Sequence, residues 1–131
     1  MTGVQTCALP IYPHLVTAFS VAGLTLEEFV LPEVVMSLGL VPTAAYATPS
    51  TPDVSKSIQG LIERYDALIL ERHGALTVGQ DLMDAYNKME KLEHSALVIF
   101  TALQLGRVRL LPPREVEKLM QMRHLKRLES C

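Results

Sequence analysis

Hydrophobic positions in the first half of the chain predict two short apolar elements and one extended segment. Residues 14–23 are predicted to form a buried helix that ends at its own glycine, because glycine closes helices readily. Residues 31–39 are also apolar and end at a glycine, and their spacing fits a helix or a strand. Residues 41–46 should be extended, because Pro42 disfavours a helical conformation in the residue before it.

A helix start is predicted near residue 52. Ser50 or Thr51 can cap the first turn, Pro52 suits the first helical position, and Asp53 favours the positive end of the helix dipole. Apolar residues then recur at helical spacing and form one predicted stripe, which consists of Val54, Ile58, Leu61 and Ile62.

The middle of the chain predicts two neighbouring strands. Residues 67–70 form a short unbroken apolar run within the segment 66–72, which is typical of a central strand covered on both faces. His73 and Gly74 end this strand, and residues 75–78 predict a second one. Strands that alternate with helices along a chain indicate an α/β fold, in which helices pack on the faces of a sheet.

Two helices are predicted in the last third of the chain. Residues 81–105 keep the helical period throughout, with Lys88, Glu90 and Lys91 facing solvent. The predicted apolar stripe of this helix is Leu82, Ala85, Tyr86, Met89, Leu92, Ala96, Ile99, Phe100 and Leu103. After a double proline a final amphipathic helix is predicted, with an apolar face of Val116, Leu119, Met120 and Leu128.

Length, composition and charge narrow the class of protein. The 131 residues suffice for one domain, and 49% hydrophobic against 20% charged residues exclude a disordered chain. A net charge of −2, with 5% aromatic residues and no tryptophan, argues against a nucleic-acid partner. No apolar run reaches the roughly 18 residues of a membrane span. Cys7 and Cys131 have neither a metal-binding nor a disulfide spacing, which favours free thiols and a cytoplasmic location.

The first eleven residues match a laboratory oligonucleotide. The run MTGVQTCALPI is the translation of a common sequencing adapter read from a GTG start codon, and the match covers residues 1–11 completely. We therefore expect residues 1–11 to be a non-native segment, left out of fold reasoning like an expression scar. Residues 12–131 would then be the C-terminal part of a single domain whose upstream part was lost. The codon of Tyr12 would begin with the adapter's last base, so the native residue is histidine, asparagine, aspartate or tyrosine.

His73 and Tyr46 are the candidate functional residues. His73 follows a buried strand, at the end where ligands bind in open α/β sheets, and Gly74 leaves room beside its imidazole. The alternative is a histidine satisfied by a backbone carbonyl at a strand end. Tyr46 ends an extended segment and its phenol can act as a general acid, the alternative being an ordinary half-buried tyrosine. His94 and His124 are predicted at solvent-facing helix positions.

Several segments together resemble the C-terminal half of the class II aldolase/adducin family. They are residues 13–23 (PHLVTAFSVAG), 41–48 (VPTAAYAT) and 71–79 (ERHGALTVG), followed by the helix that contains DAY at 84–86 and EKLE at 90–93. The His-Gly pair alone is a weak motif. The set in this order is specific, and the resemblance covers nearly all of the chain after the adapter match.

The resemblance implies a fold, an assembly and a metal. Enzymes of this family have a three-layer α/β/α sandwich, here N-terminally truncated, and form homotetramers. They bind a divalent metal, usually zinc, through two histidines of a His-x-His-Pro motif and one of the His-Gly motif. The resemblance places His73 at the third metal ligand and Tyr12 where the second histidine belongs. Tyr46 matches a tyrosine that acts as a proton donor in a neighbouring subunit's site.

The resemblance also implies the chemistry of the intact parent. It would be a zinc-dependent lyase acting on a sugar phosphate such as fuculose-, rhamnulose- or ribulose-phosphate, through an enediolate that zinc with an open coordination position stabilises. A 4-epimerase and a non-catalytic adducin-like assembly module are the alternatives. With a single metal-ligating imidazole, the 131-residue chain itself should be inactive. Loss of upstream strands should leave Val34, Val35 and the strand 67–70 partly uncovered.

Overall fold

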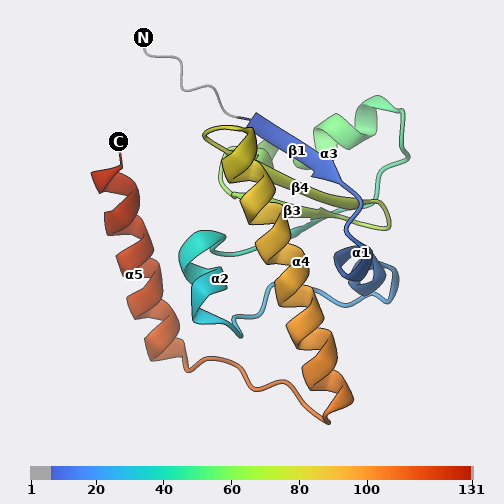
Figure 1. Cartoon of the computed structure of the whole chain (residues 1–131). Coiled ribbons are helices and arrows are strands. Elements are labelled where there is room, and N and C mark those ends of the chain that lie inside the picture. Colours follow the sequence, from blue (N-terminus) through green and yellow to red (C-terminus); the bar gives the residue numbers. More distant parts are fainter. Residues whose placement is uncertain (1–6, 131) are drawn as a thin grey trace.

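The chain folds around a mixed sheet (Figure 1). A computed structural model describes residues 7–130, and within them four strands join in one sheet. β4 runs antiparallel to both of its neighbours, whereas the remaining pair of strands is parallel. The strands predicted at 67–70 and 75–78 are confirmed and form an antiparallel hairpin. In their order across the sheet the strands are β1 (Cys7–Ile11), β4 (Gly74–Gly79), β3 (Ala67–Leu70) and β2 (Thr43–Ala44).

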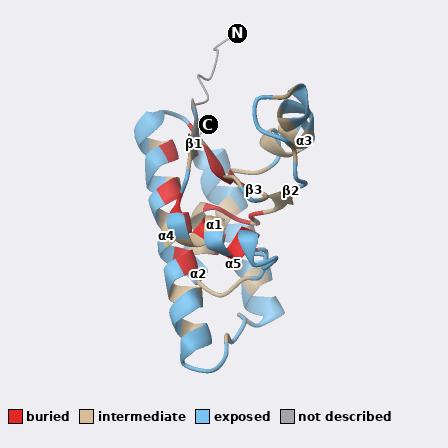
Figure 2. Ribbon diagram, turned by 90° about the vertical axis from the view of Figure 1, so that its right-hand side faces the viewer, coloured by how far each residue is buried: buried red, intermediate tan, exposed pale blue. Residues whose placement is uncertain are grey.

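Helices lie on both sides of this sheet (Figures 1 and 2). The described residues form α1 (His14–Val21), α2 (Pro32–Ser37), α3 (Pro52–Ile62), α4 (Leu82–Gln104) and α5 (Pro113–Glu129). α1 and α4 pack on one face, and α3 lies on the opposite side, against β2 and β3. α5 packs mainly against α2. The expected α/β class is therefore confirmed. Within the part of the chain that is described, none of these helices is long and apolar enough to cross a membrane.

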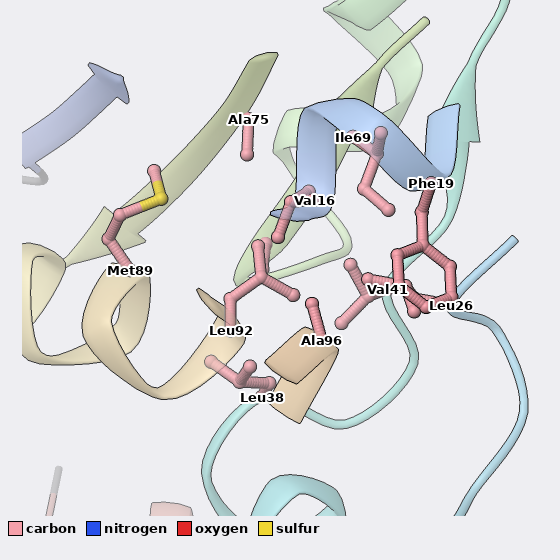
Figure 3. Close-up of a cluster of buried hydrophobic side chains, with 11 residues drawn as sticks. Val16, Phe19, Leu26, Leu38, Val41, Ile69, Ala75, Met89, Leu92 and Ala96 are labelled. Carbon is pink, nitrogen blue, oxygen red and sulfur yellow. The ribbon is translucent and has the colours of Figure 1, made fainter. Parts of the chain in front are cut away.

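The main hydrophobic core lies between the sheet and the helices α1 and α4 (Figure 3). Because alternate residues of a strand face opposite sides, every second residue of β3 and β4 points into this layer. The core side chains shown are Val16, Phe19, Leu26, Leu38, Val41, Ile69, Ala75, Met89, Leu92 and Ala96. Leu68 lies between two residues of β3 that join this core and is itself fully buried. Both faces of β3 are therefore covered, as expected for a central strand.

Helix α4 buries a narrower face than its sequence predicts. Its central positions are buried, whereas Leu82 is 60% exposed and Phe100 is 43% exposed. Lys88 was expected in solvent, and that expectation is wrong, because its side chain is only 16% exposed. Its ammonium group donates to the carbonyl oxygen of Val78 and pairs with Asp84. A periodic pattern assigns lysine to the surface, but nearby carboxylate and carbonyl oxygens can hold its charged end against the sheet.

The predicted apolar face of helix α5 is only partly buried. All residues of α5 are described and none of them is fully buried. Val116, Leu119 and Met120 of the expected face are half-buried, whereas Leu128 is 61% exposed. The expected stripe is therefore present in the first half of the helix and does not extend to Leu128.

Most of the region expected to be uncovered is buried. Val35 and the first three residues of β3 are fully buried, so the expectation of partly uncovered apolar faces is wrong for them. Val34 and Leu70 are half-buried, as expected. The segment 31–39 contains helix α2, and Gly39 follows it in the left-handed conformation, with φ of +68°. The edge of β4 is covered because β1 pairs with it along its whole length. The thiol of Cys7 and all of Cys131 lie outside what the structure describes.

Candidate functional site

His73 lies in the tight turn that joins β3 to β4. Its backbone N–H donates a hydrogen bond of 2.9 Å to the carbonyl oxygen of Leu70, which closes the turn. The preceding residue, Arg72, has φ of +58°, a left-handed conformation that is uncommon for residues other than glycine. The sequence placed His73 at the end of a buried strand, and this is confirmed. The turn leads into an antiparallel hairpin partner rather than into a helix.

Gly74 allows β1 to approach the turn closely. A Cβ atom at position 74 would lie 2.6 Å from the carbonyl oxygen of Ile11, far inside van der Waals contact. The pairing of Ile11 with Ala75 therefore requires glycine at this position. Sequence reasoning assigned Gly74 the role of giving room to the imidazole, whereas the structure shows that it gives room to a neighbouring strand.

Tyr12 and His73 lie side by side. Tyr12 follows the last residue of β1, and its ring centroid is 5.1 Å from that of His73, with the ring planes at 77°. This edge-to-face geometry is a favourable aromatic contact. The Tyr12 side chain is nonetheless 71% exposed, so the pair lies at the surface. Positions 12 and 73, which are far apart in the sequence, are thus brought together.

Sequence reasoning missed the long-range hydrogen bonds that hold helix α1, which begins two residues after Tyr12, against the His73 turn and α4. The buried hydroxyl of Ser20 accepts a 2.7 Å hydrogen bond from the backbone N–H of Arg72. The carboxylate of Glu93, on α4, accepts hydrogen bonds from the N–H groups of Leu15 and Val16 at 2.9 and 3.1 Å. The sequence did contain one sign that a distant residue caps this helix. Pro13 precedes the helix and has no side-chain oxygen that could cap it.

Tyr46 lies near the His73 turn without lining it. Its backbone N–H donates a 3.0 Å hydrogen bond to the carboxylate of Glu71, two residues before His73. A shallow hollow beside this contact is lined by Ala45, Ala47, Val54, Ser57, Leu70, Glu71 and His73. Tyr46 itself is 55% exposed. The backbone of the Tyr46 segment is therefore tied to the turn, while its ring remains accessible from outside.

The other histidines lie away from this pair or at its margin. His94 and His124 are exposed on α4 and α5, as predicted. His14 is exposed at the first position of α1. Among the residues that the structure describes, no three His, Cys, Asp or Glu side chains are grouped closely enough to hold a metal ion.

A second polar cluster lies at the far end of β4. Asp66 is 14% exposed and pairs with Arg123, Arg127 and Lys88. Burial lowers the pKa of Arg123, and the nearby Asp66 opposes that effect. Burial would raise the pKa of Asp84, but its hydrogen bond from the Gln80 N–H and its pairing with Lys88 hold that pKa below its ordinary value. The cluster fixes α5 to the body, and it lies at the opposite end of β4 from His73.

The fold is similar to that of a solved protein described as a putative aldolase/epimerase/decarboxylase. YgbL of Klebsiella pneumoniae superposes with a TM-score of 0.78 at 34% identity, over 86% of this chain and 56% of its own. Residues 10–100 match the family model described as the class II aldolase and adducin N-terminal domain. The chain belongs to this family.

Two curated relatives illustrate its range. The 3-oxo-tetronate 4-phosphate decarboxylase of Pectobacterium atrosepticum is 38% identical over 69 residues, which are 53% of this chain and 32% of that protein. The L-fuculose phosphate aldolase of Methanococcus maripaludis strain C7 is 34% identical over 80 residues, which are 61% of this chain and 43% of that protein. The chain thus spans from about a third to less than half of the length of these relatives.

Proposed function

We propose that the whole protein is a metal-dependent lyase acting on a sugar phosphate, with His73 as one metal ligand. The observation that carries this proposal is the contact between positions 12 and 73 at the edge of β4. Family membership supports it, because relatives are named as a sugar-phosphate aldolase and a sugar-acid-phosphate decarboxylase. A decarboxylase of a phosphorylated keto acid is the second candidate, favoured by the 38% identity to the Pectobacterium protein.

The residues present in this chain do not fit a complete zinc site. The donors that meet at the turn are the imidazole of His73 and the phenol of Tyr12, whereas a catalytic zinc site needs three protein ligands, commonly imidazoles. We propose that both missing histidines were lost at the adapter junction. One would have been replaced by residues 1–11, and the other would have been changed to Tyr12 by the adapter's last base. No reaction step is therefore assigned to a metal in this chain.

Tyr46 is proposed as the proton donor of a neighbouring subunit's site. The residue is 55% exposed, and the hydrogen bond to Glu71 fixes its backbone. A phenol at the surface is free to reach a substrate held by another chain, which agrees with the homotetramer proposed for the parent. Helices on both sides of the sheet support a three-layer α/β/α sandwich for the whole protein.

The decisive experiment uses the native gene. Its sequence just before Pro13 should contain a His-x-His pair, and the full-length protein should show lyase activity on sugar phosphates that a chelator abolishes. His73→Ala should lower kcat/KM by at least about 100-fold, while the exposed His124→Ala should not change it. A native gene without the histidine pair, or a His73→Ala enzyme with full activity, would contradict the proposal and favour an adducin-like assembly module.

A further inference from the structure

We propose that helix α1 fixes the position of residue 12 relative to His73, and that Ser20 and Glu93 are the positioning residues that hold this helix. The inference deepens the proposed function, on whose assignment of positions 12 and 73 it rests. Neither side chain belongs to the pair itself. Both act on backbone groups next to it, Ser20 on Arg72 and Glu93 on the first turn of α1.

Glu93 fixes the end of α1 that follows Tyr12. The first N–H groups of a helix lack partners within the helix, and Pro13 supplies no cap. Both carboxylate oxygens of Glu93 accept from this turn, and their negative charge favours the positive end of the helix dipole. The backbone of α4 at Glu93 is held in place, because Leu92 and Ala96 on the same helix are buried in the core. The direction in which the chain leaves Tyr12 is therefore set by α4.

Ser20 fixes the other end of α1 to the His73 turn. Its side chain is 5% exposed, and its hydroxyl accepts the N–H of Arg72 at 2.7 Å. Arg72 occupies a left-handed conformation that costs about 1 kcal/mol or more in a residue other than glycine. The hydrogen bond from this N–H to Ser20 stabilises that conformation. His73 is the next residue, so the position of its imidazole depends on the conformation of Arg72.

Helix α1 thereby connects the two positions as one rigid element. Its eight residues span about 12 Å, and Val16 and Phe19 between the two contacts are buried in the core. Sliding or rotating the helix would move residue 12 and the His73 turn by different amounts. The two polar contacts define the position of the helix along its axis, which nondirectional apolar packing alone defines poorly.

The contact between Tyr12 and His73 provides a direct measurement. The ring current of Tyr12 changes the NMR chemical shift of the His73 Cε1 proton. We define the contact signal as the difference between this chemical shift in the chain with Tyr12 and in the Tyr12→Leu variant. Ser20→Ala and Glu93→Ala should each remove most of this signal while circular dichroism shows a folded chain. Ser95→Ala removes a buried hydroxyl of α4 and is the matched control, which should keep the signal.

Conservative variants separate positioning from general stability. Ser20→Thr keeps the hydroxyl and should restore the contact signal, and Glu93→Gln keeps one acceptor oxygen and should restore part of it. Should an alanine variant not fold, these two folded variants decide the question. Retention of the full signal in folded Ser20→Ala and Glu93→Ala chains, or an equal loss in Ser95→Ala, would overturn the inference.

Zinc binding distinguishes failure of this inference from failure of the proposed function. Tyr12→His supplies a second imidazole beside His73 and should raise the affinity for zinc in calorimetric titration. Adding Ser20→Ala to that chain should weaken zinc binding by roughly tenfold. If Tyr12→His gives no gain in affinity but Ser20→Ala still removes the contact signal, the metal assignment fails and the positioning role stands. A gain that Ser20→Ala leaves unchanged defeats the positioning role alone.

Discussion

At the scale of single residues, the absence of a Cβ atom at Gly74 allows β1 to pack against the His73 turn. At position 74 a methyl group would lie 2.6 Å from the Ile11 carbonyl oxygen, which is backbone and cannot yield as a flexible side chain would. Gly39, by contrast, faces the guanidinium of Arg123, and it requires glycine because of its φ of +68°. The two glycines look alike in the sequence, so only the three-dimensional neighbourhood tells which of them the site depends on.

We expect Gly74→Ala to destabilise the chain by about 2 kcal/mol, since the methyl group overpacks the junction of β1 and β4. The same change should separate Tyr12 from His73. Urea denaturation measures the first effect, and the His73 NMR signal measures the second. Gly60→Ala is the matched control, because nothing lies within 4 Å of a Cβ at that helical position. It should stabilise the chain by about 0.5–1 kcal/mol, and an equal effect of both changes would contradict the clash.

At the scale of the elements, α5 depends on polar contacts more than α4, the other long helix that is described, does. It buries none of its residues, whereas α4 buries five. Arg123 and Arg127 connect it to Asp66, and Arg123 also donates to the carbonyl oxygen of Leu38. A helix held by few charged contacts and little apolar area detaches more easily than one packed into a core.

Asp66→Asn should therefore release α5 selectively. Removing one partner of a largely buried ion pair costs about 3 kcal/mol, and here it leaves Arg123 desolvated. Hydrogen–deuterium exchange should become fast in α5 and stay slow in α4. Asp53→Asn, which breaks an exposed pair with Lys56, serves as the control and should change neither helix. Equal loss of protection in α4 would show that Asp66 supports the whole fold instead.

At the scale of the whole molecule, the sequence predicted elements better than contacts. An unbroken apolar run located β3, because a strand covered on both faces is apolar throughout, and the helical period located α4. The pattern also predicted α5 as a helix, but it placed Leu128 on a buried face and Lys88 in solvent, because a pattern records the type of a side chain and not its partner. The pattern could not predict the Ser20 and Glu93 contacts for the same reason, since each joins residues more than fifty positions apart.

The 131-residue chain should have no lyase activity of its own. It brings one imidazole and one phenol together, and the described residues hold no group of three metal-binding side chains. Incubation with zinc and fuculose-, rhamnulose- or ribulose-phosphate should release no product above the rate in buffer. The matched comparison is the full-length protein under the same conditions, and clear turnover by the short chain would contradict the assignment of missing ligands.

Strand β1 joins the sheet by backbone pairing, from Cys7 opposite Gly79 to Ile11 opposite Ala75. Backbone pairing is largely indifferent to side-chain identity, so a chain shortened to begin at Pro13 would leave the edge of β4 open to a separate synthetic peptide. A six-residue peptide that replaces residues 7–12 and carries histidine at its fourth and sixth positions would then supply the two missing imidazoles beside His73, and its binding would report on strand exchange.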